Sequence, residues 1–155
     1  MNSYQQVLDR AEEQCVENGS KLTKKRRTVL LGLLRSEMAL SAYELADYCR
    51  DELGEAMPSM SVYRILEFLE NEQLVHKLKL ANRYVACVHI TCDHQHAVPQ
   101  FLICEKCHKV SEVDITASTM RSIRSKLANS GFRLASEQLE LNCVCNDCAD
   151  MEAAV

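Results

Sequence analysis

The chain has 155 residues, which suffices for one domain or two small ones. Its formal net charge of −4 argues against a protein that coats nucleic acid, although a local basic patch remains compatible with it. No apolar run approaches the length that spans a bilayer, and the first residues lack the basic start and apolar stretch of a signal peptide. We therefore expect a cytoplasmic protein without membrane association.

The first third of the chain predicts three helices. Apolar residues within 4–15 recur at helical spacing and predict the first. Thr23 is a candidate N-cap for a second helix that runs to about residue 37. Ser41 and Glu44 have the spacing of a capping box, in which each side chain satisfies a backbone N–H that the helix leaves unpaired. A third helix therefore begins after Ser41.

A fourth helix and a hairpin follow. Pro58 and Ser59 open the helix, and its apolar stripe lies at i, i+3, i+4 and i+7: Val62, Ile65, Leu66 and Leu69. Tyr63 and Arg64 point away from that stripe. Two strands are predicted over 74–78 and 84–90, with a turn between them. Helices in this order, closed by a hairpin, describe a winged helix-turn-helix.

The sequence changes character near Thr91, where a polar, His-rich segment runs into Pro99. The elements predicted beyond it are two short strands, a helix and a last strand: 101–103, 110–114, 116–129 and 138–144. The predicted fold class is therefore α+β. It has a winged-helix domain (1–88), a hinge (89–98) and a C-terminal α/β domain (99–155).

Two Cys-x-x-Cys pairs provide four soft ligands, the usual makeup of a closed tetrahedral zinc site: Cys104, Cys107, Cys145 and Cys148. The chain has nine cysteines, and in a reducing compartment they favour metal ligation over disulfides. The alternatives are buried apolar thiols or thiol–disulfide exchange, which places a thiolate at a helix N-terminus. No helical pattern begins at Cys107, which argues against exchange there. The sequence assigns no role to Cys15, Cys49 or Cys143.

Several motifs occur in an order that resembles the ferric uptake regulator superfamily of bacterial metal-sensing repressors, and within it most the zinc-sensing branch. The motifs are Leu22-Thr23-x3-Arg27, Ser41-Ala42-Tyr43-Glu44-Leu45, Ser61-Val62-Tyr63-Arg64-Ile65-Leu66, His76-Lys77 and the two Cys pairs. The resemblance implies a homodimer that binds a palindromic operator in double-stranded DNA when loaded with metal. The N-terminal domain would bind DNA and the C-terminal domain would dimerise.

The resemblance also implies a second, sensing zinc ion, which makes two zinc ions per chain. By position, or nearly so, its ligands would be His76, Cys87, His96 and Glu112. Cys87 lies on the returning wing strand opposite His76, and Glu112 belongs to the C-terminal domain. A metal held by these three would join the domains, as a switch requires.

The ligand from the hinge stays open, because the spacing from Cys87 to Cys104 is longer than in the family pattern. His96 is nearest the expected place and His94 is the runner-up. The hinge region also offers His89, Cys92 and Asp93. A thiolate with imidazoles and a carboxylate suits tetrahedral zinc, and residues 97–101 lack the dense His run of the iron regulators.

Candidate DNA contacts fall on the fourth predicted helix and near residue 24. The planar fork of Arg64 suits guanine O6 and N7, and Tyr63 could touch a phosphate or a thymine methyl group. Ser59 and Ser61 could bind phosphate together with free backbone N–H groups. A basic cluster is expected to meet the DNA backbone: Lys24, Lys25, Arg26 and Arg27.

The leading hypothesis is a zinc-responsive repressor of zinc uptake genes. One alternative within the superfamily is a sensor of iron, manganese or peroxide. Alternatives of other classes are a Cys-x-x-Cys thiol oxidoreductase and a zinc-stapled interaction module that does not bind DNA. No nucleophile–base constellation stands out, so we expect no enzyme activity.

Overall fold

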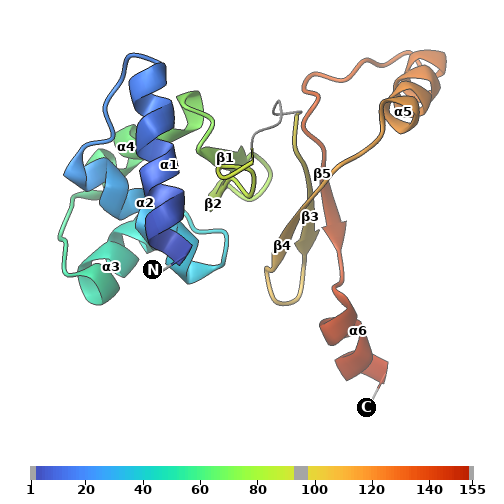
Figure 1. Ribbon diagram of the computed structural model, residues 1–155. Helices are drawn as coiled ribbons and strands as arrows, with labels where there is room; N and C mark the ends of the chain where they lie inside the picture. Colours follow the sequence, from blue (N-terminus) through green and yellow to red (C-terminus); the bar gives the residue numbers. More distant parts are fainter. Residues whose placement is uncertain (1–2, 93–97, 154–155) are drawn as a thin grey trace. The chain divides into compact units, whose positions relative to one another are not determined.

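The computed structural model describes residues 3–92 and 98–153 and divides the chain into two compact units, Met1–Asp93 and His94–Val155 (Figure 1). The hinge candidates His94 and His96, and Asp93 with them, lie outside the described residues. Within the described ranges, no helix has both the length and the apolar character that crossing a membrane requires.

The first unit packs its helices around an apolar core (Figure 1): α1 (Ser3–Glu17), α2 (Lys24–Ser36), α3 (Ala42–Leu53) and α4 (Ser59–Asn71). The predicted stripe of α4 is largely buried, with Val62, Leu66 and Leu69 fully shielded. Gly32 lets α2 approach α3 closely, because a Cβ there would lie 2.9 Å from Leu45 Cδ1.

Local capping explains where two of these helices begin. The Thr23 side chain accepts a hydrogen bond from the backbone N–H of Arg26 at the start of α2. The Ser41–Glu44 capping box is present at the start of α3, with both of its hydrogen bonds formed. The sequence prediction for both helix starts is therefore confirmed.

The wing consists of β1 (Val75–Leu78) and β2 (Arg83–Ala86), paired antiparallel with His76 opposite Val85. The predicted second wing strand is present but shorter than the predicted span 84–90, since β2 ends at Ala86. The backbone N–H of Cys87 still bonds Leu74 O at 2.9 Å, but Cys92 N then bonds His89 O at 3.0 Å. That bond closes a turn and ends the strand.

The second unit holds a three-stranded sheet in the order β4-β3-β5. Its strands are β3 (Gln100–Cys104), β4 (Val110–Val113) and β5 (Glu140–Cys143), and its helices are α5 (Ala117–Asn129) and α6 (Asn146–Ala153). β4 runs antiparallel to β3 and β5 runs parallel to it. The helices lie beyond opposite ends of the sheet (Figure 1).

The end of this unit differs from its prediction. The last strand is shorter than 138–144, and α6 was not predicted at all. No residue of α6 is buried, so the helix carries no apolar stripe for a sequence pattern to reveal. The predicted fold class is confirmed: α+β, a winged helix-turn-helix followed by an α/β unit.

Candidate metal centres and nucleic-acid interface

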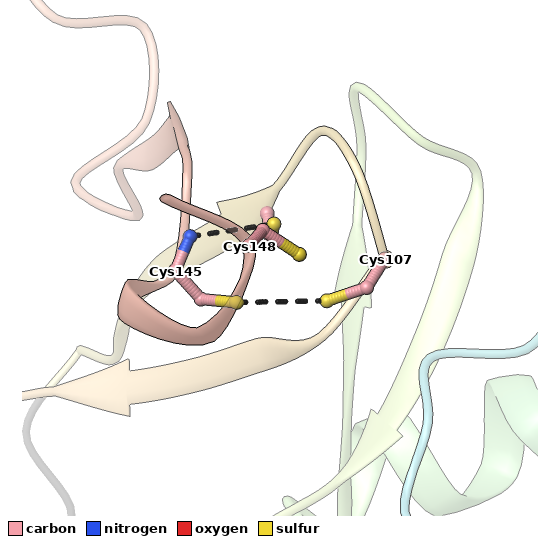
Figure 2. Close-up of side chains that lie close together, drawn as sticks. Cys107, Cys145 and Cys148 are labelled. Atoms are coloured by element: carbon pink, nitrogen blue, oxygen red, sulfur yellow. Dashed lines mark hydrogen bonds between the residues drawn. The ribbon is translucent and has the colours of Figure 1, made fainter. Parts of the chain in front are cut away.

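The two Cys-x-x-Cys pairs meet in the second unit. Cys104 ends β3, Cys107 lies in the turn that follows, and the second pair spans the start of α6. One ligand sulfur from each of the four cysteines lies within 4.8 Å of the others. Figure 2 shows Cys107, Cys145 and Cys148 with their side chains turned toward one another.

A tight backbone turn follows Cys104 and sets the position of Cys107. His108 has a φ of 62°, in the left-handed region, and its N–H bonds Cys104 O at 2.9 Å. The N–H of Cys104 in turn bonds Lys109 O at 2.9 Å. The turn therefore directs Cys107 back over the end of β3, beside the second pair.

One distance between sulfurs of different pairs matches tetrahedral ligation. Zn–S bonds of about 2.3 Å in a tetrahedron place two sulfurs roughly 3.8 Å apart. The Sγ atoms of Cys107 and Cys145 are 3.7 Å apart, far beyond the length of a disulfide bond. Cys104 is buried and Cys107 is exposed, so the site is shallow, yet its donors are those that structural zinc prefers.

Hydrogen bonds shift the pKa values of two cluster thiols in opposite directions. Hydrogen bonds from the backbone N–H groups of Cys107 and Cys145 lower the pKa of the Cys104 thiol to about 6. The pKa of Cys148 is raised to about 12, chiefly because its protonated form hydrogen-bonds the Cys145 side chain. One thiolate is thus favoured while a neighbour stays protonated. A divalent cation would let all four ionise together.

The second pair lies at a helix N-terminus, since Ala149 N bonds Cys145 O at 2.9 Å as α6 begins. Exchange enzymes place their reactive thiol in this setting. The sequence argument against thiol–disulfide exchange therefore holds for the first pair alone. The closeness of sulfurs from different pairs still favours a shared ion over exchange within one pair.

Sequence reasoning missed the position of Cys143. This residue ends β5 and lies opposite Cys104 in the parallel register of β3 and β5. Both residues line one cleft of about 450 Å³. The sequence showed Cys143 only as a fifth cysteine, without an assigned role, near the second pair. Its position opposite Cys104 depends on the pairing of β3 with β5, which the local sequence does not reveal.

The wing brings together two of the predicted sensing ligands. His76 lies on β1 and is half-buried, and Cys87 follows β2 and is 3% exposed. The ligand atoms of the two residues lie within 4.8 Å of one another. The backbone N–H of His89 also points to Cys87 Sγ at 3.3 Å. An imidazole and a thiol so placed could hold one metal ion from the wing.

The other predicted sensing ligands do not belong to the wing. Glu112 lies on β4 of the second unit, opposite Phe101 in the β3–β4 register, and is half-buried. His96 and its runner-up His94 lie outside the described residues. Cys92 is half-buried just before that gap. Their share in a metal site therefore stays a prediction.

The predicted base-reading residues of α4 differ in burial, because Tyr63, which was predicted to point away from the core stripe, packs partly against the apolar core. Arg64 is exposed and makes no hydrogen bond or ion pair with the described part of the chain. Tyr63 is half-buried and stacks edge-on against Tyr43, with ring centroids 6.4 Å apart. Ser59 and Ser61 lie at the start of α4, where the N-cap Pro58 provides no side-chain hydrogen bond. This helix end can accept an anion.

The basic cluster near residue 24 divides into two pairs. Lys24 and Lys25 are exposed. The Arg26 guanidinium instead lies 3.6 Å from the centroid of the Phe68 ring and donates to Lys21 O at 2.6 Å. Arg27 bonds the carboxylates of Asp9 and Glu12 at 2.8 and 3.1 Å. The two arginines thus have structural contacts that the sequence did not indicate.

Comparisons with known proteins cover both units. The sequence model of the ferric uptake regulator family matches residues 17–152. The zinc uptake regulation protein of Escherichia coli (strain K12) is 33% identical over 151 residues, which cover 96% of this chain and 85% of the relative. A solved zinc uptake regulator complexed with zinc and DNA matches with a TM-score of 0.82, 30% identity and 99% of each chain covered. The holo form of XcZur matches with a TM-score of 0.72 and 33% identity, covering 92% of this chain and 96% of that one.

Proposed function

The chain belongs to the ferric uptake regulator family, and from that premise we propose that it is a zinc-responsive, DNA-binding transcriptional repressor of zinc uptake genes. The observation that carries the proposal is the pair of His76 and Cys87, whose ligand atoms lie within 4.8 Å on the wing of the DNA-reading unit. An imidazole and a thiolate suit zinc better than they suit the harder cations that prefer oxygen ligands.

The proposal assigns two zinc ions to each chain. The first would be structural, held by Cys104, Cys107, Cys145 and Cys148, whose sulfurs lie within 4.8 Å of one another and are the donors that structural zinc prefers. The second would be exchangeable, with His76 and Cys87 as ligands from the wing, Glu112 from β4 and His96 from the hinge, or His94 in its place. A bound dication would supply the attraction that keeps thiolate, imidazole and carboxylate at one point.

The mechanism that we propose is a population shift. Without the second ion, the winged-helix unit samples many orientations relative to the unit that dimerises. Once one zinc ion is bound by ligands from both the wing and β4, one orientation is favoured. If zinc binds this orientation more strongly than the others by several kcal/mol, the orientation becomes dominant. In a homodimer, that orientation would present both copies of α4 to major grooves about one helical turn apart on a palindromic operator.

The proposal assigns a role in DNA binding to specific residues of the winged-helix unit. Arg64 would read a guanine, and Tyr63 would contact a phosphate or a thymine methyl group. Ser59 and Ser61 would bind phosphate at the N-terminus of α4. Lys24 and Lys25 would contribute salt-dependent affinity. We infer that the protein acts in the cytoplasm, on DNA, without enzymatic turnover.

The test measures DNA binding under buffered free zinc, iron and manganese. Duplexes selected from a random library by the zinc-loaded protein serve as probe, and fluorescence anisotropy reports binding. We expect binding to rise with free zinc and to be lost in Cys87→Ala, which should keep its tightly held zinc and its dimer. Arg64→Ala should retain zinc stoichiometry but lose sequence preference. A response to iron and not to zinc, or zinc-dependent binding by Cys87→Ala equal to that of the parent, contradicts the proposal.

A further inference from the structure

The parallel pairing of β3 and β5 places a fifth thiol beside the four-cysteine cluster. Cys143 is the register partner of Cys104, and the neighbouring pairs in the same ladder are Leu102 with Leu141 and Ile103 with Asn142. Neighbouring strands lie about 4.8 Å apart, within the Cα separation of about 4.4–6.8 Å that a disulfide spans. The separation of the two strands is therefore compatible with a bond between these two sulfurs.

The two thiols also share a face of the sheet. Side chains of residues directly opposite in a ladder project to the same side, and a common cleft of about 450 Å³ is lined by both, together with Lys109 and Ser111. Cys143 is half-buried and Cys104 is 3% exposed. A small solute that enters the cleft therefore reaches Cys143 more readily than it reaches the sulfur of Cys104.

We propose that Cys143 is an oxidation-sensitive thiol that captures Cys104 as a disulfide and thereby empties the four-cysteine site. The inference rests on the structural zinc proposed above, because Cys104 is one of its ligands. It does not depend on the sensing site or on DNA recognition. The signal in this inference is a peroxide, and it acts on the second unit.

The chemistry balances with a peroxide as the oxidant. The Cys143 sulfur attacks one oxygen of hydrogen peroxide, the O–O bond breaks, and Cys143 becomes a sulfenic acid as water forms. The Cys104 sulfur then attacks the Cys143 sulfur. An S–S bond forms, the S–O bond breaks, and hydroxide leaves and takes up a proton to give a second water. The remaining three cluster cysteines no longer make a closed tetrahedral set.

Other cysteines are less suited to this reaction. Cys15 and Cys49 are fully buried in the core of the first unit, away from any solute. Cys107, Cys145 and Cys148 have no ladder partner among the thiols and would be occupied as ligands. Cys143 is the thiol of the second unit that the zinc proposal leaves unused.

The experiment uses the full-length protein after mild chelation, which removes exchangeable zinc and leaves the tightly held ion. Hydrogen peroxide is added, zinc release is followed with a colorimetric chelator, and disulfides are mapped by mass spectrometry after nonreducing digestion. We expect a peptide that links Cys104 to Cys143, formed at the rate of zinc release, and recovery of zinc binding after reduction. Cys143→Ser should slow the release several-fold.

A matched control moves the thiol to the other face of β5. Asn142→Cys combined with Cys143→Ser keeps the number of cysteines but places the thiol opposite Ile103 instead of Cys104. This variant should behave like Cys143→Ser. Zinc release at the parent rate in Cys143→Ser, or a parent disulfide that joins Cys104 to another cysteine, overturns the inference. Protein that carries no zinc before peroxide is added overturns instead the structural zinc on which the inference rests.

Discussion

The Glu44 carboxylate joins the start of α3 to the wing, because its Oε2 lies 2.6 Å from Nη1 of Arg83 and also accepts the backbone N–H of Ser41. Arg83 Nη1 donates to Ala39 O as well, at 3.2 Å. Beside this contact, Leu40 and Tyr84 exchange two backbone hydrogen bonds. The segment before α3 thus fastens β2, and the wing is held at a fixed angle to the helices of its own unit.

Replacing Glu44 with alanine should therefore lower stability. The variant loses half of the capping box and a half-exposed ion pair, so we expect the free energy of unfolding to fall by about 1 kcal/mol. Thermal unfolding of Glu44→Ala measures the loss, and a double-mutant cycle with Arg83→Ala isolates the ion pair.

Glu52→Ala is the matched control, since Glu52 is exposed on the same helix. Its effect should stay within about 0.5 kcal/mol. Equal unfolding midpoints for Glu44→Ala and Glu52→Ala would show that the Glu44 contacts contribute nothing measurable.

Local signals in the sequence predicted much of this fold. The Ser41–Glu44 box and the Thr23 cap depend on residues three positions apart, so the start of each helix could be read directly. The spacing within each Cys-x-x-Cys pair is also a local signal, and the presence of two such pairs predicted a four-sulfur cluster. The relation of Cys143 to Cys104 could not be predicted, because it depends on a parallel pairing between strands that are distant in the chain.

The contacts of the basic residues were missed for a similar reason. A run of lysine and arginine predicts a charged surface, but it does not reveal that Arg26 faces Phe68 from a different helix. The exposed Arg64 is the opposite case, since helical periodicity alone placed it away from the core stripe. Periodicity predicts which face a side chain takes, whereas its partners depend on the packing of distant segments.

Zinc binding to the four-cysteine site should release more protons at acidic pH than at neutral pH. Above its pKa of about 6, Cys104 is already a thiolate in the metal-free protein and has no proton to lose. Below that pKa it is protonated, so one further proton must leave for each ion bound. The count per zinc should therefore rise by about one between about pH 7 and about pH 5.

Calorimetric zinc titrations in buffers of different ionisation enthalpy measure this count. The Cys87→Ala variant is the suitable protein, since we expect it to lack the exchangeable site. The lowered pKa of Cys104 also stabilises the metal-free fold. This contribution is complete at pH values above 9.0, the ordinary pKa of the thiol, and it is lost as the pH falls through about 6. A proton count that stays constant over the acidic range would show that Cys104 is not ionised at neutral pH.

Arg26→Ala and Lys24→Ala should affect different properties. Arg26 lies over Phe68 at 3.6 Å, so its removal should cost about 0.5–1 kcal/mol of stability and leave the salt dependence of DNA binding nearly unchanged. Lys24 is exposed, so its removal should leave stability intact. If Lys24 meets a phosphate, the slope of log affinity against log salt should fall by about 0.9 in Lys24→Ala. Chemical unfolding and anisotropy titrations at several salt concentrations separate the two effects. A slope that falls equally in both variants would place Arg26 on the DNA backbone and show that its stacking on Phe68 is exchanged for a phosphate contact.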